Sequence, residues 1–171
     1  MKKREALSIL LLLAPLSLFI GCGYKPSTYY TKPLLGDKIS TNVTIDIKNP
    51  TDSVFLKDAL NEAVLGVFNA KVDLKSDTKI LLKVNKAEII TLDYDENGYP
   101  ILYRAKTSIT AYITDKNNNF NNYSAIGYYD FSLQKNSVLS DDLKHNAIKE
   151  AFSQALQKIE FKLAERGIND H

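Results

Sequence analysis

The fold is decided by a long hairpin at residues 79–115, with the sequence KILLKVNKAEIITLDYDENGYPILYRAKTSITAYITD. Two segments rich in apolar residues, 79–94 and 99–115, flank the pair Asn97-Gly98. Asn-Gly is the pair best suited to a two-residue type I′ turn, because both positions tolerate a positive φ. The hairpin sequence therefore predicts two antiparallel strands joined at this turn.

Pairing the two strands about this turn places apolar residues opposite one another on one face of the hairpin. The predicted pairs are Tyr94 with Ile101, Leu92 with Tyr103, Ile90 with Ala105, Val84 with Ala111 and Leu82 with Ile113. Lys86 and Glu88 break the pattern, because they fall on the same apolar face. Either a β-bulge shifts the phase of the strand there, or the strand runs beyond the core. The sequence leaves both explanations open.

Further strands and a helix are expected on both sides of the hairpin. Alternating apolar and polar residues over 39–47 predict a strand with one buried face. Apolar residues at three- and four-residue spacing predict an amphipathic helix over 53–68, and residues 69–78 are expected to be irregular. A fourth strand is expected at 120–133, after a turn in the asparagine-rich stretch 117–122.

The last predicted helix, at 140–166, carries the strongest apolar stripe of the chain. Ser140 can cap its start, and Gly167 suits its exit. The order of elements is then β-α-β-β-β-α. The sequence predicts an α+β fold, a two-layer sandwich in which two helices cover one face of a four-stranded, mostly antiparallel sheet.

The N-terminus has the features of a secretory signal. Three basic residues at 2–4 precede an almost wholly apolar stretch at 6–21. A transmembrane helix needs about 20 apolar residues, whereas this stretch is shorter and contains Pro15. We therefore expect residues 1–21 to be a signal peptide and not a permanent membrane span.

Cys22 is the only cysteine of the chain and follows this segment directly. The sequence LFIGC at 18–22 resembles the bacterial lipobox, in which the cysteine is acylated and becomes the first residue of the mature protein. The alternative is a buried free thiol, the usual fate of a single cysteine. We expect lipid attachment at Cys22, because a signal segment contributes nothing to a core. The residue after it, Gly23, is not Asp, which in the enterobacterial sorting rule favours the outer membrane.

The rest of the chain suits a single domain of moderate size. We divide the chain into the signal peptide 1–21, an acylated N-terminus with an extended tether at 22–37, and one α+β domain at 38–171. The tether is expected because this stretch contains prolines and glycines. Removing the signal peptide leaves 19 basic and 19 acidic residues, so the mature protein lacks the basic excess of a nucleic-acid-binding protein.

Catalysis finds little support in the sequence. The chain contains two histidines, His145 and His171, and Cys22 is expected to be acylated, so a zinc ligand set is missing. The acidic group at 93–96 lacks the spacing of a calcium loop and is interpreted as a solvated turn. We expect no enzymatic activity, no metal, and no cofactor apart from covalent acyl chains on Cys22.

The sheet face away from the helices is the informative one, because it should be polar if it only meets water. Aromatic and aliphatic residues are instead interleaved with basic ones on this face. The mixture favours contact with a partner, and scattered surface apolar residues are the alternative. The residues expected to face a partner are Lys83, Ile89, Leu102, Tyr112, Ile126 and Tyr128.

With anchor, tether and element order in place, the chain resembles the LptE family, lipoproteins of lipopolysaccharide assembly at the outer membrane. The resemblance covers nearly all of the mature chain in layout, and it is carried by the joint order of four features. These are Cys22-Gly23-Tyr24, the Asn97-Gly98 turn followed by Tyr103, the stretch 123–131, and the sequence AIKEA at 147–151. The resemblance implies a sandwich of two helices and a four-stranded sheet.

The resemblance also implies a non-enzymatic function. A member of the family sits as a plug inside the LptD β-barrel of a Gram-negative outer membrane, helps that barrel assemble and helps lipopolysaccharide reach the outer leaflet. The implied partners are an LptD-like barrel and lipopolysaccharide, with the protein lipid-anchored on the periplasmic side. The alternative is a periplasm-facing lipoprotein that binds a small ligand or peptidoglycan without a barrel.

Direct contacts with lipopolysaccharide are a separate expectation. Family members carry a basic residue at the hairpin tip and another before the last helix, where lipid phosphates could pair with it. Glu96 and Ser140 stand at those positions here. The nearest substitutes are Arg104 and Lys106 on the open face and Lys135 ahead of the helix, with solvated surface charges as the alternative.

Replacing Cys22 with alanine is expected to abolish acylation, because no other thiol can accept the lipid. Metabolic labelling with a radioactive fatty acid in the native host checks this, with the wild-type chain at equal expression as the control. Labelling that survives in Cys22→Ala would rule out the lipobox.

Overall fold

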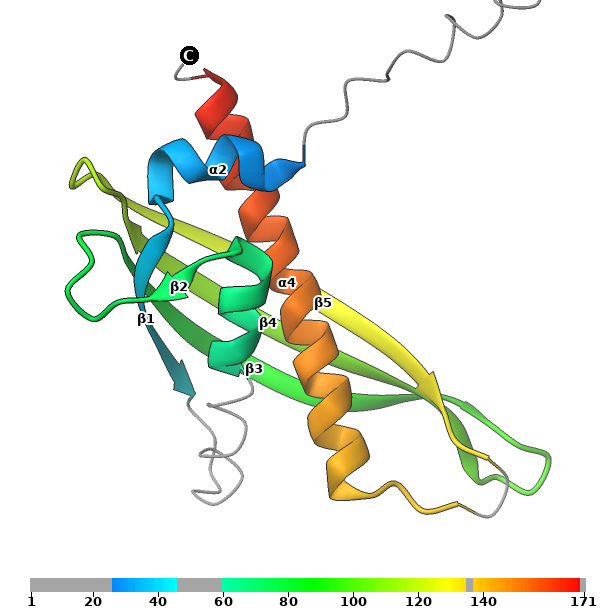
Figure 1. Ribbon diagram of the computed structural model, residues 1–171. Helices are drawn as coiled ribbons and strands as arrows, with labels where there is room; N and C mark the ends of the chain where they lie inside the picture. Colours follow the sequence, from blue (N-terminus) through cyan, green and yellow to red (C-terminus); the bar gives the residue numbers. More distant parts are fainter. Residues whose placement is uncertain (1–25, 46–59, 135–136, 170–171) are drawn as a thin grey trace, which may run out of the picture.

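The computed structural model of the chain describes residues 26–45, 60–134 and 137–169 (Figure 1). The predictions for the signal peptide, the lipobox and Cys22 lie outside these residues, as do those for Lys135 and His171. The elements in chain order are α2 (Ser27–Leu35), β1 (Lys38–Ile45), a helix that includes residues 60–68, β2 (Lys71–Val72), β3 (Lys79–Tyr94), β4 (Pro100–Thr114), β5 (Phe120–Ser132) and α4 (Asp141–Asn169).

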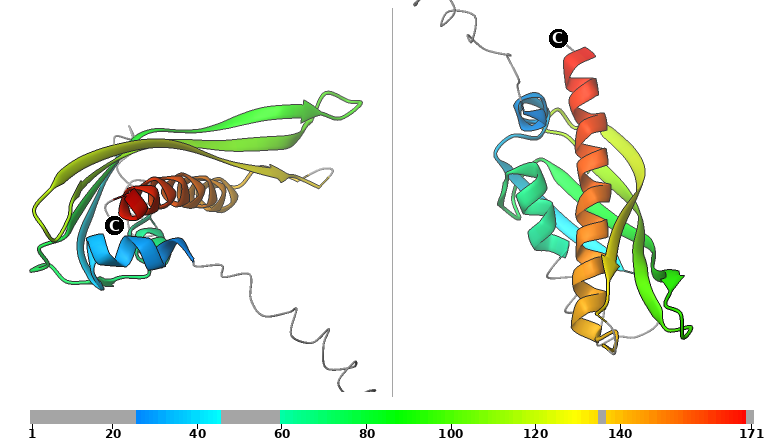
Figure 2. Two further views of the ribbon diagram at one scale, coloured as in Figure 1. Left: turned by 90° about the horizontal axis from the view of Figure 1, so that it is seen from above. Right: turned by 90° about the vertical axis from the view of Figure 1, so that its right-hand side faces the viewer.

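The strands form one mixed sheet in the order β2-β1-β3-β4-β5. β1 runs parallel to both β2 and β3, whereas β4 is antiparallel to its two neighbours, β3 and β5. The helices of the described residues all lie on one side of this sheet (Figure 2). The predicted α+β class and two-layer arrangement are therefore confirmed, but three helices and five strands replace the expected two and four.

Helix α2 replaces most of the extended tether that the prolines suggested. Pro26 stands just before the helix, and Pro33 lies in its last turn. The helix forms because Leu34 and Leu35 are buried in the core, so tertiary packing outweighs the cost of the internal proline. Gly36, at φ 76°, ends the helix and donates its N–H to the carbonyl of residue 32.

Strand β2 lies within the stretch 69–78 that was expected to be irregular. Its two residues, Lys71 and Val72, pair in parallel with Lys38 and Ile39 at the start of β1. A strand of two residues is too short to show a period-two pattern, so it could not be predicted from the sequence.

The predicted register of the β3–β4 hairpin is wrong. Leu82 pairs with Ala111, not Ile113, and Val84 pairs with Ile109. Closer to the turn, the observed pairs are Ile90 with Arg104, Thr91 with Tyr103 and Tyr94 with Pro100. Register shifts occur between Val84 and Lys86, between Thr91 and Asp93, and between Asp93 and Tyr94. The first shift is a β-bulge between Val84 and Lys86. Of the two explanations for the break at Lys86 and Glu88, the bulge is therefore the correct one.

The turn itself differs from the predicted type I′ geometry. Gly98 has φ 82°, but Asn97 is not in the left-handed region. Asp95 organises the turn, because its Oδ1 accepts the backbone N–H groups of Asn97 and Tyr99, each at 2.9 Å. The backbone N–H of Asp95 also donates to the carbonyl of Tyr99 at 2.8 Å, which closes a longer loop than a two-residue turn.

The β4–β5 turn repeats this arrangement in the asparagine-rich stretch. Asp115 Oδ1 accepts the N–H groups of Asn117 and Asn119 at 2.9 and 3.0 Å, and Asn118 has φ 63°. The expected turn is thus confirmed, with its centre at 115–119. The last two asparagines of the cluster belong to β5.

Helix α4 supplies the main apolar layer over the sheet. Ser140 Oγ accepts the N–H of Leu143 at 3.3 Å, which confirms the predicted cap. Gly167 does not end the helix, because α4 continues to Asn169. A Cβ at Gly167 would lie 2.5 Å from the carbonyl oxygen of Tyr30, so this glycine lets α2 approach α4 closely. The largest side chains of α4 that are fully buried in the core are Phe152, Leu156, Ile159 and Leu163.

Gly127 marks a very close contact between α4 and the sheet. A Cβ on this residue would overlap the backbone carbonyl of Ala151 and lie 2.6 Å from the backbone N of Ala155. Backbone atoms cannot move aside as a flexible side chain can. The lack of a side chain at Gly127 therefore sets how closely α4 approaches β5.

Gly127→Ala is expected to lower the free energy of unfolding by about 2–3 kcal/mol through overpacking. Urea denaturation followed by circular dichroism measures this change. Gly66→Ala is the matched control, because a Cβ there meets nothing within 4 Å, and it should raise stability by up to ~1 kcal/mol through helix propensity. A Gly127→Ala chain as stable as wild type would show that the close contact does not limit the packing.

Candidate functional site

The open face of the sheet, defined here as the side away from the helices, carries most of the predicted partner-facing residues. On β4 the side chains alternate, with buried residues toward the helices and half-buried ones on the open face. Leu102, Tyr112 and Lys83 lie on the open face, together with Ile126 and Tyr128, which are each 40% exposed. This face is therefore both accessible and mixed in chemistry, as expected.

Ile89 is the exception among the predicted residues. The bulge after Val84 shifts the phase of β3, so Ile89 pairs with Ala105 and packs beside Ala147 on the helix side. Ile90, which is 37% exposed, takes its place on the open face next to Arg104. The prediction for Ile89 was wrong because it extended one alternation through a bulge.

A chain of hydrogen bonds crosses the centre of the open face. Asn85, at the bulge, donates from its Nδ2 to Thr110 Oγ1 at 2.9 Å. The hydroxyl of Thr110 also lies 3.0 Å from that of Ser124, so the three residues link β3, β4 and β5. Sequence reasoning missed this polar ladder, because it depends on the observed register.

Both predicted phosphate contacts on the open face already have acidic partners. Arg104 donates from Nε and Nη2 to the two carboxylate oxygens of Asp130, each at 2.7 Å. This hydrogen bonding and the adjacent charge lower the pKa of Asp130 below its ordinary value. Lys106 Nζ lies 3.7 Å from Glu88, which Lys86 also contacts at 2.7 Å. A lipid phosphate at Arg104 would have to compete with Asp130.

Tyr128 lies between two cations. The guanidinium carbon of Arg104 is 5.4 Å from the centre of its ring, and Lys158 Nζ of α4 is 5.6 Å from the same centre. Such cation–π contacts hold the ring in place at the boundary between the open face and the β5 edge. Neither partner of the ring was visible from the sequence.

Two lysines of α4 cover part of the free edge of β5. Lys158 Nζ donates to the carbonyl of Ile126 at 2.7 Å, and Lys162 Nζ donates to that of Ser124 at 2.9 Å. An unpaired edge strand is a template for pairing with another chain. The two lysines satisfy edge carbonyls that would otherwise be open to such pairing.

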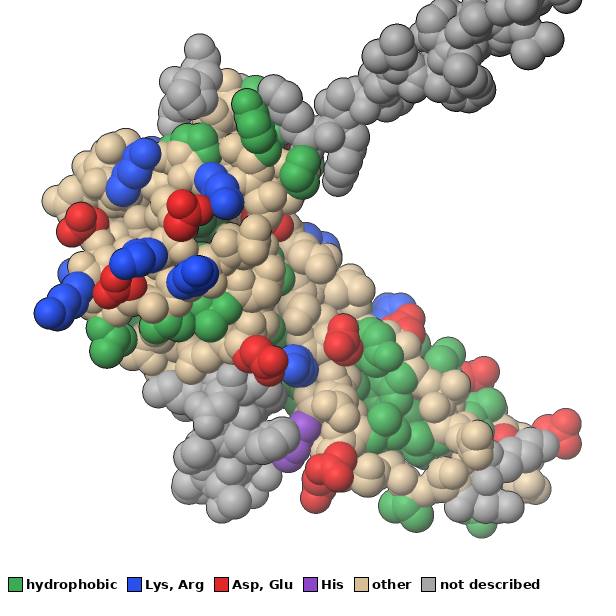
Figure 3. Space-filling model, viewed as in Figure 1, with side chains coloured by type: hydrophobic (Ala, Val, Ile, Leu, Met, Phe, Trp, Pro, Cys, Tyr) green, Lys and Arg blue, Asp and Glu red, His purple; other side chains and the backbone are tan. Residues whose placement is uncertain are grey.

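Apolar side chains also gather on the part of the sheet that extends past α4 (Figure 3). Tyr103 stacks on Phe131 with ring centres 5.5 Å apart, and Tyr129 stacks on Phe131 at 6.2 Å. Tyr129 is 37% exposed, so this aromatic row extends from the core to the surface. It lies on the helix side of the sheet and adds an apolar surface that the predictions did not include.

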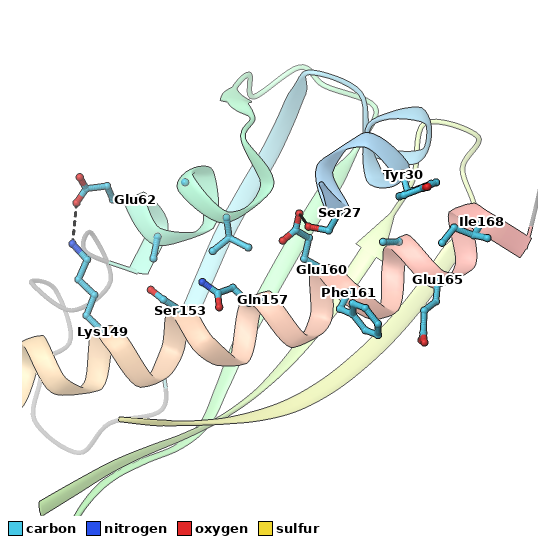
Figure 4. Close-up of a pocket in the computed structure, with 14 residues that line it drawn as sticks. Ser27, Tyr30, Glu62, Lys149, Ser153, Gln157, Glu160, Phe161, Glu165 and Ile168 are labelled. Carbon is cyan, nitrogen blue, oxygen red and sulfur yellow. Dashed lines mark hydrogen bonds and ion pairs between the residues drawn. The ribbon is translucent and has the colours of Figure 1, made fainter. Parts of the chain in front are cut away.

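A groove lies on the outer side of the helical layer, between α4, residues 60–68 and the start of α2 (Figure 4). Glu160 is buried in it, and its Oε1 accepts the hydroxyl of Ser27 at 2.9 Å. Burial raises the pKa of Glu160 above its ordinary value of 4.5, and the hydrogen bond from Ser27 offsets part of this effect. Sequence reasoning placed Ser27 in the tether and could not foresee the contact.

The described residues contain no cluster of three or more His, Cys, Asp or Glu that could hold a metal ion. In the acidic group at the hairpin tip, the Asp95 carboxylate accepts hydrogen bonds from backbone N–H groups of its own turn. No helix in the described ranges is long and apolar enough to cross a bilayer.

The chain is similar to solved structures of bacterial proteins that are described as lipoproteins. A lipoprotein of Caulobacter crescentus aligns with a TM-score of 0.51 at 14% identity, over 85% of this chain and 97% of that one. The rare lipoprotein B of Shewanella oneidensis aligns with a TM-score of 0.42 at 12% identity, over 78% of this chain and 92% of that one. A minor lipoprotein of Acinetobacter baumannii aligns with a TM-score of 0.44 at 12% identity, over 78% of this chain and 95% of that one. Among curated protein sequences, none matches this chain.

Sequence similarity identifies the family to which the chain belongs. The model of the LptE family, described as lipopolysaccharide-assembly, matches residues 41–163. This span holds most of the sheet and most of α4. The chain belongs to the LptE family, as its resemblance indicated.

The raised pKa of Glu160 predicts a pH dependence of stability. A carboxyl group whose pKa is higher in the folded state costs stability when it ionises, so the free energy of unfolding should fall as the pH rises above 4.5. Glu160→Gln should remove this contribution. The free energy of unfolding of the variant, relative to that of wild type, should therefore be higher at pH 8 than at pH 4. The charged groups that share the groove are Glu62, Lys149 and Glu165.

Urea denaturation at several pH values measures this difference. Glu150→Gln, an exposed change on the same helix outside the groove, is the control and should keep the wild-type profile. Parallel profiles for wild type and Glu160→Gln would contradict the prediction.

Proposed function

We propose that this protein is a non-enzymatic, lipid-anchored protein of the outer membrane that works with an LptD-type β-barrel in lipopolysaccharide assembly. Membership of the LptE family over residues 41–163 is the observation that carries the proposal. The barrel partner, the outer-membrane location and the lipid on Cys22 are parts of this proposal.

The arrangement of the layers supports a partner on the open face. The helices of the described residues all cover the other side of the sheet, so no described segment of the chain packs over the open face (Figure 2). Interfaces combine apolar and aromatic groups with polar ones, and this face holds Tyr128 and Ile126 next to the polar ladder. The inner wall of a barrel is polar but packed, and a mixed surface of this kind fits it.

The double variant Ile126→Asp/Tyr128→Asp is expected to reduce recovery of the barrel by at least about tenfold, because it removes an aliphatic and an aromatic contact and puts two charged groups in the interface. Tagged mature protein is purified from detergent extracts of the native host, and the barrel is quantified by mass spectrometry. Leu74→Asp is the control, since this exposed apolar residue lies in the loop before β3 and should leave recovery unchanged. Wild-type protein that brings down no barrel would contradict the proposal.

Direct binding of lipopolysaccharide is proposed at Arg104 and Lys106, with Lys135 as a further contact. Because Asp130 competes for Arg104, Asp130→Asn should strengthen lipopolysaccharide binding, and Arg104→Ala should weaken it by about tenfold. Surface plasmon resonance with immobilised protein measures both affinities. If both variants bind lipopolysaccharide with the wild-type affinity, Arg104 is excluded as a phosphate contact.

A further inference from the structure

We propose that the groove between α4, residues 60–68 and the start of α2 binds an alkylammonium ligand, a small molecule with one primary amine on an apolar chain. Glu160 is the counter-ion of that amine. This site lies on the helical side of the molecule, opposite the open face. It does not depend on the function proposed above.

The size and lining of the groove suit a small molecule. Its volume is about 830 Å³, within the range of ligand pockets. Gly66 forms part of the wall and leaves space, because a Cβ there would meet no atom within 4 Å. Val67, Phe161 and Ile168 supply apolar surface, and the last two are 61% and 52% exposed. An apolar chain would cover these side chains.

Glu160 gives the groove a specific charge requirement. Its side chain is only 6% exposed, and among the described residues the hydroxyl of Ser27 is its one polar contact. A buried carboxylate without a cation is costly, whereas a paired and hydrogen-bonded one is stabilised. An ammonium group at Glu160 would supply the missing cation.

Taken together, the charged side chains that line the groove favour a cation over an anion. Glu62, Glu160 and Glu165 contribute three carboxylates, and Lys149 contributes the one ammonium group. Lys149 Nζ already lies 3.4 Å from Glu62 Oε2, so its charge is neutralised. A phosphate or carboxylate ligand would meet a net negative wall and be repelled.

The spacing along α4 also matches an ammonium group. Ser153, Gln157 and Glu160 follow one another at i, i+4 and i+7, so they share one face of the helix and line the groove together (Figure 4). An ammonium group has three donors. The carboxylate of Glu160, the amide oxygen of Gln157 and the hydroxyl of Ser153 are three acceptors on that face.

The test uses hexylammonium as the probe, because it is soluble and forms no micelles at millimolar concentration. The full mature chain from residue 22, carrying Cys22→Ala, is titrated and followed by NMR chemical shifts. We expect saturable shifts at Gly66, Val67, Ser153 and Phe161. Hexanol and hexanoate, matched in chain length, should bind at least tenfold more weakly.

Two variants separate the site from general apolar binding. Glu160→Gln keeps the volume and the acceptor for Ser27 and should weaken hexylammonium binding at least tenfold. Gly66→Leu fills the groove without a clash at its Cβ and should abolish the shifts. Glu150→Gln, on the same helix but outside the groove, should bind as the parent chain does.

Equal affinity for hexylammonium and hexanol would overturn the proposal, and so would wild-type affinity in Glu160→Gln or Gly66→Leu. Shifts confined to residues outside the groove would overturn it as well. None of these results would change the recovery of a barrel from detergent extracts, so failure here is distinguishable from failure of the proposed function.

Discussion

The close packing of α4 on β5 at Gly127 is the contact on which the rest of the structure depends. With no side chain at this point, the helix backbone at Ala151 lies directly against the strand. At this short distance Lys158 and Lys162 can reach the carbonyls of the β5 edge. One long helix thus covers the core side of the sheet and satisfies part of its free edge. All the described helices gather on that side, and the other face stays open.

The parts of the fold that the sequence predicted are those with strong local patterns. The strand alternation in 79–94 and 99–115 and the apolar stripe of 140–166 gave β3, β4 and α4 with the correct layers. The predictions that were wrong, the hairpin register and the extended tether, concern features that depend on tertiary geometry and not on a local sequence pattern. The register of the hairpin follows from three shifts between β3 and β4, of which only the first had a sign in the sequence. Helix α2 contains Pro33 and forms through burial against the core, which propensity alone does not reveal.

The candidate site shows the same division. Lys83, Leu102, Tyr112, Ile126 and Tyr128 lie on the open face as predicted, because alternation holds along each strand between bulges. Ile89 lies beyond a bulge and faces the helices. Pairings between elements were out of reach, since the contacts of Arg104 with Asp130 and of Glu160 with Ser27 join residues 26 and 133 positions apart.

These features describe a small member of the LptE family with two different surfaces, a mixed open sheet on one side and an acidic groove on the other. The function proposed above requires that the open sheet, and not the helical side, meets the barrel. Photo-crosslinking in living cells tests this most directly, with p-benzoylphenylalanine placed at Tyr128 on the open face or at Phe161 on α4. We expect a covalent adduct with an outer-membrane barrel from position 128 and none from position 161. An adduct from position 161 alone would contradict the assignment of the open face as the partner surface.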